Sequence, residues 1–193
     1  MASPSRVDGL VLFHGAGGDR NHRLFLAMEA TIDVPVARLE FPYRQKGPGR
    51  RPPDRMPVLK ASALEQIEAA AADWGTTTDR LVIGGRSMGG RVCSMIVADG
   101  LAVAGLLLLS YPLHPPGKPD KLRTEHFASI DCPVLLVQGS SDPFGKEPEF
   151  AEHLSTIPGP VEQLWLERTG HDPVARCDSD VIDRTQLWMT GLV

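Results

Sequence analysis

Residues 81–92 constrain the fold of this chain more than any other stretch. The apolar run at residues 81–83 leads into the pentapeptide Gly-Arg-Ser-Met-Gly of residues 85–89, and a segment of helical character follows at residues 91–98. Glycines on both sides of Ser87 lack the Cβ atoms that would collide where a strand closes onto a helix, and such a turn holds its central residue in a strained conformation. The pattern therefore predicts a strand, a sharp turn and a helix, with Ser87 presented at the carboxyl end of a sheet.

The position of Ser87 predicts a chemical role as well as a backbone shape. A residue at a helix N-terminus lies beside free N–H groups, which stabilise negative charge. Glycine-rich turns containing serine also occur as ordinary strand-to-helix turns in doubly wound proteins. The residues that follow the other strands decide between a nucleophile and such a turn.

Apolar runs alternate with helical segments along the whole chain. Several runs are apolar on both faces, which a parallel sheet covered by helices on both sides requires. Four prolines exclude regular structure within residues 44–57. The sequence predicts one α/β domain over residues 1–193, with a six-stranded, mostly parallel sheet and helices on both faces. Strands are expected at residues 7–13, 34–41, 80–84, 104–110, 134–138 and 162–167, and helices at 21–30, 57–75, 91–98, 121–130, 146–156 and 179–190.

Composition restricts the function classes that fit this chain. Its 193 residues are 42% hydrophobic and 23% charged, as in an ordinary globular domain. A net charge of −4 gives no general electrostatic reason to bind nucleic acid or an anionic membrane. No long apolar run precedes the first polar residues, so we expect no signal peptide, no membrane span and a cytoplasmic location. The three cysteines lack zinc-type spacing and are expected to be reduced thiols: Cys93, Cys132 and Cys177.

Three residues that follow different strands have the chemistry of a nucleophilic site. Ser87 follows the third expected strand, Asp142 the fifth and His171 the sixth. All three loops emerge at one edge of a parallel sheet, so these side chains are expected to meet there. A serine hydroxyl needs a base to take its proton, and the imidazole needs an acceptor on its other nitrogen to fix its tautomer. The backbone N–H of Met88 and an N–H of the loop at residues 14–16 are placed to form an oxyanion hole.

With these residues in view, the chain resembles an α/β-hydrolase over nearly its whole length. More narrowly, it is similar to the small hydrolase-like family named for testis-expressed and KAN-type nuclear proteins, near the dienelactone hydrolases. The stretches that carry the resemblance are Phe-His-Gly-Ala-Gly-Gly at 13–18, Phe-Pro-Tyr at 41–43, Gly-Gly-Arg-Ser-Met-Gly-Gly-Arg at 84–91, Ser-Tyr-Pro-Leu-His at 110–114, Leu-Arg-Thr-Glu-His at 122–126, Gln-Gly-Ser-Ser-Asp at 138–142 and Gly-His-Asp at 170–172.

The resemblance implies a triad of Ser87, Asp142 and His171, with Ala16 and Met88 as backbone oxyanion donors. Compared with larger members, this chain is expected to lack the two leading antiparallel strands, because its first recognisable strand already carries the His-Gly loop, and no cap domain is expected between its strands. An open, shallow site is the expected consequence. Some members of the family act as subunits of larger assemblies.

Other roles are open to several of these residues. An aspartate before proline commonly bonds to its own backbone, although the position of Asp142 after the penultimate strand favours a triad role. Asp172 is adjacent to His171 and would reach its ring with difficulty. We interpret His14 as a structural residue of the glycine loop. The remaining histidines lack metal-ligand spacing and are expected at solvated or loop positions: His22, His114, His126 and His153.

A cluster of cations suggests an anionic or strongly polar substrate. Five of them fall in the proline-rich loop: Arg44, Lys46, Arg50, Arg51 and Arg55. We consider Arg50, Arg51 and Arg86 as a clamp for a carboxylate or phosphate, because arginine binds both groups in bidentate geometry. Arg86 and Arg91 flank the turn at Ser87, where they either add to this positive charge or pair with acidic side chains. The alternative is a solvated loop with no role in binding.

The sequence as a whole predicts a cytoplasmic serine hydrolase acting on an ester, thioester or related acyl bond of a small molecule. Ser87 is the expected nucleophile, His171 the base and Asp142 the residue that orients the base. No metal or organic cofactor is implied. The alternative is a non-catalytic scaffold of the same fold that uses this surface for protein contacts.

Overall fold

Six parallel strands form the sheet at the centre of the computed structural model, which describes residues 7–46, 51–173 and 175–192. The strands lie in the order β2-β1-β3-β4-β5-β6, and every neighbouring pair is parallel. The predicted α/β class is confirmed, and the described strands include no antiparallel pair. Their bounds are β1 Gly9–Phe13, β2 Val36–Leu39, β3 Leu81–Arg86, β4 Gly105–Leu109, β5 Val134–Gly139 and β6 Val161–Leu166.

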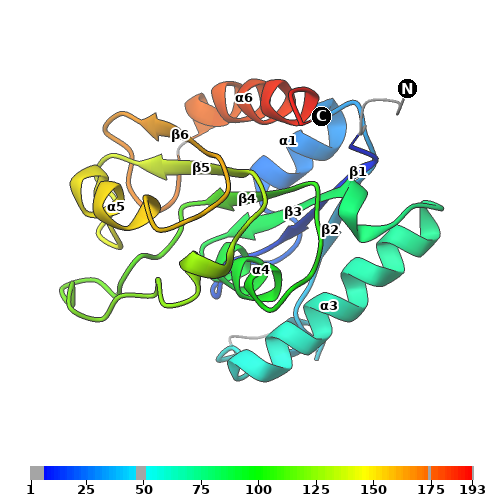
Figure 1. The fold of residues 1–193 in the computed structure, drawn as a ribbon, viewed down its shortest axis with the longest axis horizontal. Helices are drawn as coiled ribbons and strands as arrows, with labels where there is room; N and C mark the ends of the chain where they lie inside the picture. The colour runs from blue at the N-terminus through cyan, green and yellow to red at the C-terminus, as the bar shows by residue number, and fades with distance from the viewer. Residues whose placement is uncertain (1–6, 47–50, 174, 193) are drawn as a thin grey trace.

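Helices cover both faces of this sheet (Figure 1). On one face, α1 (Arg23–Thr31) packs beside α6 (Asp178–Thr190). On the other, α3 (Met56–Asp73) packs beside α4 (Met88–Ala98). Two shorter helices complete the described set: α2 (Pro42–Gln45) and α5 (Glu147–Leu154).

The inner strands supply side chains to both of the buried cores that result. In β4, Leu106 and Leu108 belong to the core beneath α3 and α4, whereas Leu107 and Leu109 belong to the core beneath α1 and α6. Successive residues of a strand point to opposite faces, so a strand covered on both sides must be apolar at every position. This requirement explains the continuous Leu run of residues 106–109.

The structure differs from the sequence prediction at residues 121–130. Instead of a helix, it contains one short 3-10 turn at Phe127–Ser129. The Arg123 N–H donates to the carbonyl of Leu113, and the Arg123 carbonyl accepts from the Tyr111 hydroxyl at 2.6 Å. Because these bonds tie the segment to the loop after β4, its backbone groups are not free for a helical ladder.

The structure also differs from the prediction in the proline-rich stretch of residues 44–57, where helical residues occur although irregular structure was expected. Helix α2 ends inside it, at Gln45, and α3 begins at Met56, with Pro57 in its first turn. Proline is tolerated there because the first N–H groups of a helix have no intrahelical acceptor. The predicted clamp residue Arg50 lies outside the described residues.

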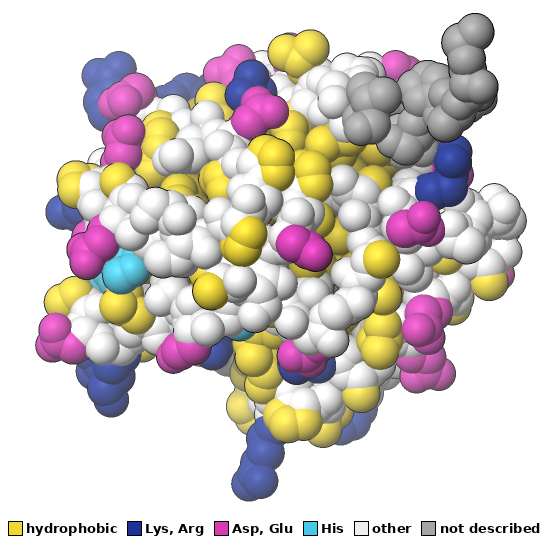
Figure 2. Space-filling view, viewed as in Figure 1, with side chains coloured by type: hydrophobic (Ala, Val, Ile, Leu, Met, Phe, Trp, Pro, Cys, Tyr) yellow, Lys and Arg dark blue, Asp and Glu magenta, His cyan; other side chains and the backbone are white. Residues whose placement is uncertain are grey.

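The surface has no single dominant charge on the face that Figure 2 shows, where acidic and basic side chains are interspersed. No helix in the described part of the chain is long and apolar enough to cross a bilayer. The loops that leave β1, β3, β5 and β6 emerge at the carboxyl edge of the sheet, which is where open α/β sheets bind ligands.

Candidate active site

Ser87 occupies the sharp turn predicted between β3 and α4. Its backbone has φ 51° and ψ −113°, a left-handed conformation that is costly for a residue with a side chain. A Cβ atom added at Gly85 or Gly89 would collide with the carbonyl oxygen of Phe13 in β1. Glycine is therefore required at both positions by the close approach of β1 to the turn. The Ser87 N–H donates to the Leu109 carbonyl at 2.8 Å, which fixes the turn against β4.

The structure brings Ser87, His171 and Asp142 into one chain of hydrogen bonds. The Oγ of Ser87 lies 2.8 Å from Nε2 of His171, and Nδ1 of His171 lies 2.8 Å from Oδ2 of Asp142. In the tautomer that these partners require, Nδ1–H donates to the carboxylate and Nε2 accepts from the serine hydroxyl. This is the arrangement in which an imidazole can take the serine proton.

Asp142 is fully buried, and its carboxylate has three hydrogen-bond donors. Oδ2 accepts from Gln138 Nε2 at 2.7 Å as well as from His171, and Oδ1 accepts from the backbone N–H of Phe144 at 2.8 Å. The local backbone bond that an Asp-Pro sequence favours thus uses one oxygen, while the other faces the imidazole. The Phe144 ring stacks on His171 with centroids 4.1 Å apart, which further restricts the imidazole plane.

The two residues predicted to supply oxyanion N–H groups line the same cavity as Ser87. Met88 is the first residue of α4, so its N–H has no intrahelical acceptor. Ala16 follows β1, and both residues line the cavity together with Ser87. The Ala16 carbonyl accepts from the Tyr43 hydroxyl at 2.9 Å, which fixes the orientation of the glycine loop. These are the two residues predicted as oxyanion donors.

His14 stabilises the glycine loop at residues 14–18 and is not part of the hydrogen-bond chain at Ser87. Its Nδ1–H donates to the Gly15 carbonyl at 2.8 Å, and its Nε2 accepts from the Phe41 N–H at 3.3 Å. This pattern needs the neutral ring, and burial lowers the pKa of His14 from its usual value. The structural role expected for His14 agrees with these contacts.

The cavity beside Ser87 has a volume of about 310 Å³. Part of its wall is apolar and is formed by Pro53, Met56, Leu59 and Phe144. The charged side chains in the wall are Asp54, Arg91 and Arg123. The cavity is small and partly charged, and therefore suits a short polar ligand better than a long acyl chain.

The two predicted clamp residues that the structure describes, Arg51 and Arg86, lie elsewhere. Arg86 donates through Nη2 to the His171 carbonyl at 3.1 Å and pairs with Asp172 at 3.2 Å, so it supports the loop that carries the imidazole. Arg51 is exposed and donates to the Lys46 carbonyl at 3.0 Å. Neither lines the cavity at Ser87. Arg123, which does line it, is not among the predicted clamp residues.

Asp172 and the other histidines occupy structural or surface positions. Asp172 is 63% exposed and contacts Arg86 and His22, not the ring of the adjacent His171. His114 and His126 are less exposed than expected for solvated residues, since they bond to Glu149 and Ser94 respectively. The described residues contain no group of three side chains that could hold a metal ion.

The comparisons with known proteins agree with this geometry. The model of the family described as alpha/beta hydrolase domain matches residues 6–190. The solved structure of Est1E from Butyrivibrio proteoclasticus superposes with a TM-score of 0.76 at 14% identity, covering 98% of this chain and 89% of that one. Dienelactone hydrolase from Anabaena variabilis gives a TM-score of 0.76 at 15% identity, over 97% and 88% of the two chains. At these identities the likeness shows the fold alone.

One curated relative is similar in sequence over part of its length. "Putative protein-lysine deacylase ABHD14B" from Pongo abelii is 32% identical over 93 residues, which is 48% of this chain and 40% of the relative. The matched stretch thus spans less than half of either protein. The family match, in contrast, covers nearly every residue of this chain, and the sheet order and the turn at Ser87 agree with it. The chain therefore belongs to the α/β-hydrolase domain family.

Proposed function

We propose that this protein is a serine hydrolase that cleaves an ester, thioester or related acyl bond through an acyl-enzyme intermediate. The observation that carries the proposal is the pair of 2.8 Å contacts that link Ser87 through His171 to the buried Asp142. A scaffold has no chemical need for a strained serine, an aligned imidazole and a buried carboxylate in one line. The dienelactone hydrolase name of one structural neighbour and the deacylase name of the partial relative support acyl chemistry.

In the proposed reaction, Ser87 Oγ attacks the acyl carbonyl carbon while its proton passes to Nε2 of His171. The carboxylate of Asp142 stabilises the imidazolium that forms. The N–H groups of Met88 and Ala16 bind the oxyanion of the tetrahedral intermediate, an interaction worth about 10²–10³ in kcat for each donor. His171 returns the proton to the leaving group. A water molecule, activated by the same imidazole, then releases the acyl group from Ser87. A cytoplasmic location is part of the proposal.

Labelling with a fluorophosphonate probe tests the proposal directly, because the probe reacts with an activated serine without knowledge of the substrate. We expect mass mapping to place the label on Ser87, and Ser87→Ala to abolish both labelling and ester hydrolysis. Ser141→Ala is the matched control, since Ser141 is an exposed serine of the loop beside Asp142 and is expected to leave labelling unchanged. A folded protein that resists the probe, or a Ser87→Ala variant with full turnover, would exclude this mechanism.

A further inference from the structure

Two arginines beside Ser87 differ from every other described arginine. Six described arginines have an acidic partner within 3.5 Å: Arg23, Arg38, Arg44, Arg80, Arg86 and Arg184. Five others are exposed: Arg20, Arg51, Arg55, Arg168 and Arg176. Among the described residues, only Arg91 and Arg123 are partly buried and lack an acidic partner, and both line the cavity at Ser87.

Each of these two side chains has one donor that the protein satisfies poorly. The Nε of Arg91 is buried, and no residue in the described part of the chain accepts from it. Arg123 donates through Nη1 to the Pro112 carbonyl at 3.3 Å, which is a long bond for a charged donor. A buried guanidinium donor without an acceptor costs free energy, so a ligand oxygen that accepts from it gains correspondingly.

The electrostatics of the surrounding residues agree with a positively charged site. Burial lowers the pKa of Arg123, and the positive charge of Arg91 is the next contribution in the same direction. Burial, followed by the charge of Arg91, lowers the pKa of His126 to about 4. The acid of the cavity wall, Asp54, has Oδ1 3.7 Å from the Lys46 ammonium. Two mutually repelling cations therefore line the cavity, and the Asp54 carboxylate in its wall has Lys46 near Oδ1 and no donor among the described residues at its buried Oδ2.

We propose that Arg91 and Arg123 bind a carboxylate or phosphate group of the substrate, so that the preferred substrates are short acyl compounds with an anionic oxygen group. This inference rests on the proposed hydrolase function for the acyl bond itself. Arg91 lies one turn of α4 beyond Ser87, so the bound anion would lie a short distance from the scissile carbonyl. Guanidinium groups bind such oxygens through paired, charge-assisted hydrogen bonds. The apolar wall residues Met56 and Leu59 would contact the short chain between the two groups.

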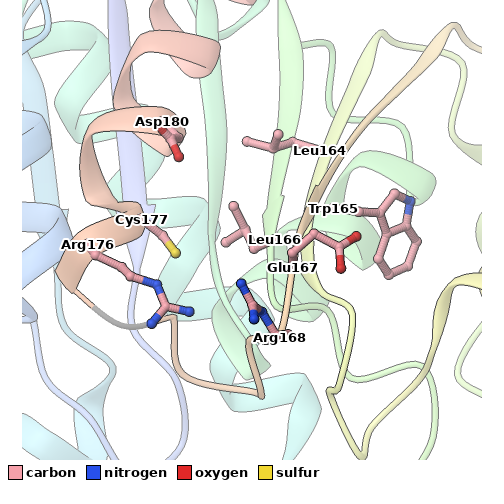
Figure 3. A pocket seen from close by; sticks show the side chains of 8 residues that line it. All are labelled: Leu164, Trp165, Leu166, Glu167, Arg168, Arg176, Cys177 and Asp180. Carbon is pink, nitrogen blue, oxygen red and sulfur yellow. The ribbon is translucent and has the colours of Figure 1, made fainter.

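A second cavity provides a control for the charge of these arginines. Its volume is about 720 Å³, it lies between β6 and the start of α6, and it shares no lining residue with the cavity at Ser87. Figure 3 shows Arg168 and Arg176 at one end of this cavity and Asp180 at the other. Arg176→Gln therefore removes the same charge as Arg91→Gln without changing the wall of the cavity at Ser87.

Kinetics with matched esters test the preference. We expect p-nitrophenyl hemiglutarate to be hydrolysed with a higher kcat/KM than neutral p-nitrophenyl butyrate. Arg91→Gln or Arg123→Gln should lower the ratio of the two values by about 10- to 100-fold, mainly through KM of the anionic ester, as expected for a charge-assisted hydrogen bond. Arg123→Lys keeps the charge but loses the bidentate geometry of the guanidinium, so it should give an intermediate ratio. Arg176→Gln should give the wild-type ratio. The inference would be overturned if Arg91→Gln and Arg123→Gln lowered kcat/KM equally for both esters, or lowered it for neither.

Binding to an inactive variant separates this inference from the hydrolase proposal. We expect calorimetry to detect binding of glutarate or inorganic phosphate to the Ser87→Ala variant. The double variant Ser87→Ala, Arg91→Gln should bind neither anion, and its circular dichroism spectrum should match that of Ser87→Ala, which shows that it is folded. Glutarate binding identifies a carboxylate site, and binding of phosphate alone identifies a phosphate site. If neither anion binds, the inference fails even where neutral esters are hydrolysed. If an anion binds but the fluorophosphonate probe does not react, the hydrolase proposal fails and the anion site remains.

Discussion

Replacing Asp142 by asparagine tests the hydrogen-bond chain at its buried end. The carboxylate accepts three bonds without exposure to solvent, from Gln138, from His171 and from the Phe144 N–H. An asparagine side chain has one accepting oxygen and one donating NH₂ group. If NH₂ replaces Oδ2, it faces two donors, and His171 must move its proton to Nε2. If NH₂ replaces Oδ1, it faces the Phe144 N–H, and a part-buried backbone donor is left unpaired.

Either arrangement is costly, and the first disables the base. With its proton on Nε2, the imidazole can no longer accept from the Ser87 hydroxyl, and the equivalent change in a serine protease triad lowers kcat by about 10⁴. Such an unpaired donor would also lower the free energy of unfolding by about 1–3 kcal/mol. We therefore expect kcat for p-nitrophenyl butyrate to fall by about 10³–10⁴ in Asp142→Asn, in a protein that remains folded at 25 °C.

Asp172→Asn is the matched control, because it makes the same chemical change in the neighbouring loop. Asp172 is 63% exposed and pairs with Arg86 and His22, and exposed ion pairs contribute only about 0–1 kcal/mol. Its kcat should stay within tenfold of the wild-type value. Steady-state turnover and urea unfolding of both variants provide the two readouts. An Asp142→Asn variant with near wild-type kcat, or a greater loss in Asp172→Asn, would refute the roles assigned to these carboxylates.

Two further predictions concern stability. Gly89→Ala places a Cβ atom against the carbonyls of Phe13 and His14, so it should lower the free energy of unfolding, measured in urea, by about 1–3 kcal/mol. Gly17→Ala is the control, because no atom lies near its Cβ, and it should change the free energy of unfolding much less. Equal effects of the two substitutions would contradict the packing argument. Burial lowers the pKa of His126 to about 4, so the unfolded chain takes up this proton first as pH falls. The free energy of unfolding should fall between about pH 6.5 and pH 4, by about 2 kcal/mol after allowance for solvent screening, and His126→Gln should reduce that slope.

The inner strands were predictable because their burial on both faces leaves a continuous apolar signal in the sequence. Each apolar run expected to be a strand contains one, and the ends differ by a few residues where strands and loops merge. The positions of Ser87, Asp142 and His171 at one edge also followed from chain order, since loops after parallel strands emerge on the same side. The catalytic roles of these residues stay predictions that the labelling experiment tests.

The arginines that face the cavity could not be identified in the same way. A cation in a proline-rich loop and a cation in a helix look alike in sequence, and only tertiary contacts distinguish paired from unpaired charges. Arg86 is next to Ser87 in the chain, yet its side chain contacts Asp172. Arg123 is 36 residues from Ser87 along the chain, yet both line one cavity, because the segment after β4 is tied to its own loop by Tyr111 and not wound into a helix.

One packing contact links the stability of this fold to the chemistry that we propose. The carbonyl of Phe13 excludes a side chain at both Gly85 and Gly89, so β1 must lie against the turn that presents Ser87. The loop that follows Phe13 carries Ala16, whose N–H we assign to the oxyanion. Any change that separates β1 from the turn therefore moves the nucleophile and an oxyanion donor apart. For this reason Gly89→Ala should lower kcat by more than its loss of stability alone would explain, under conditions where the variant is fully folded.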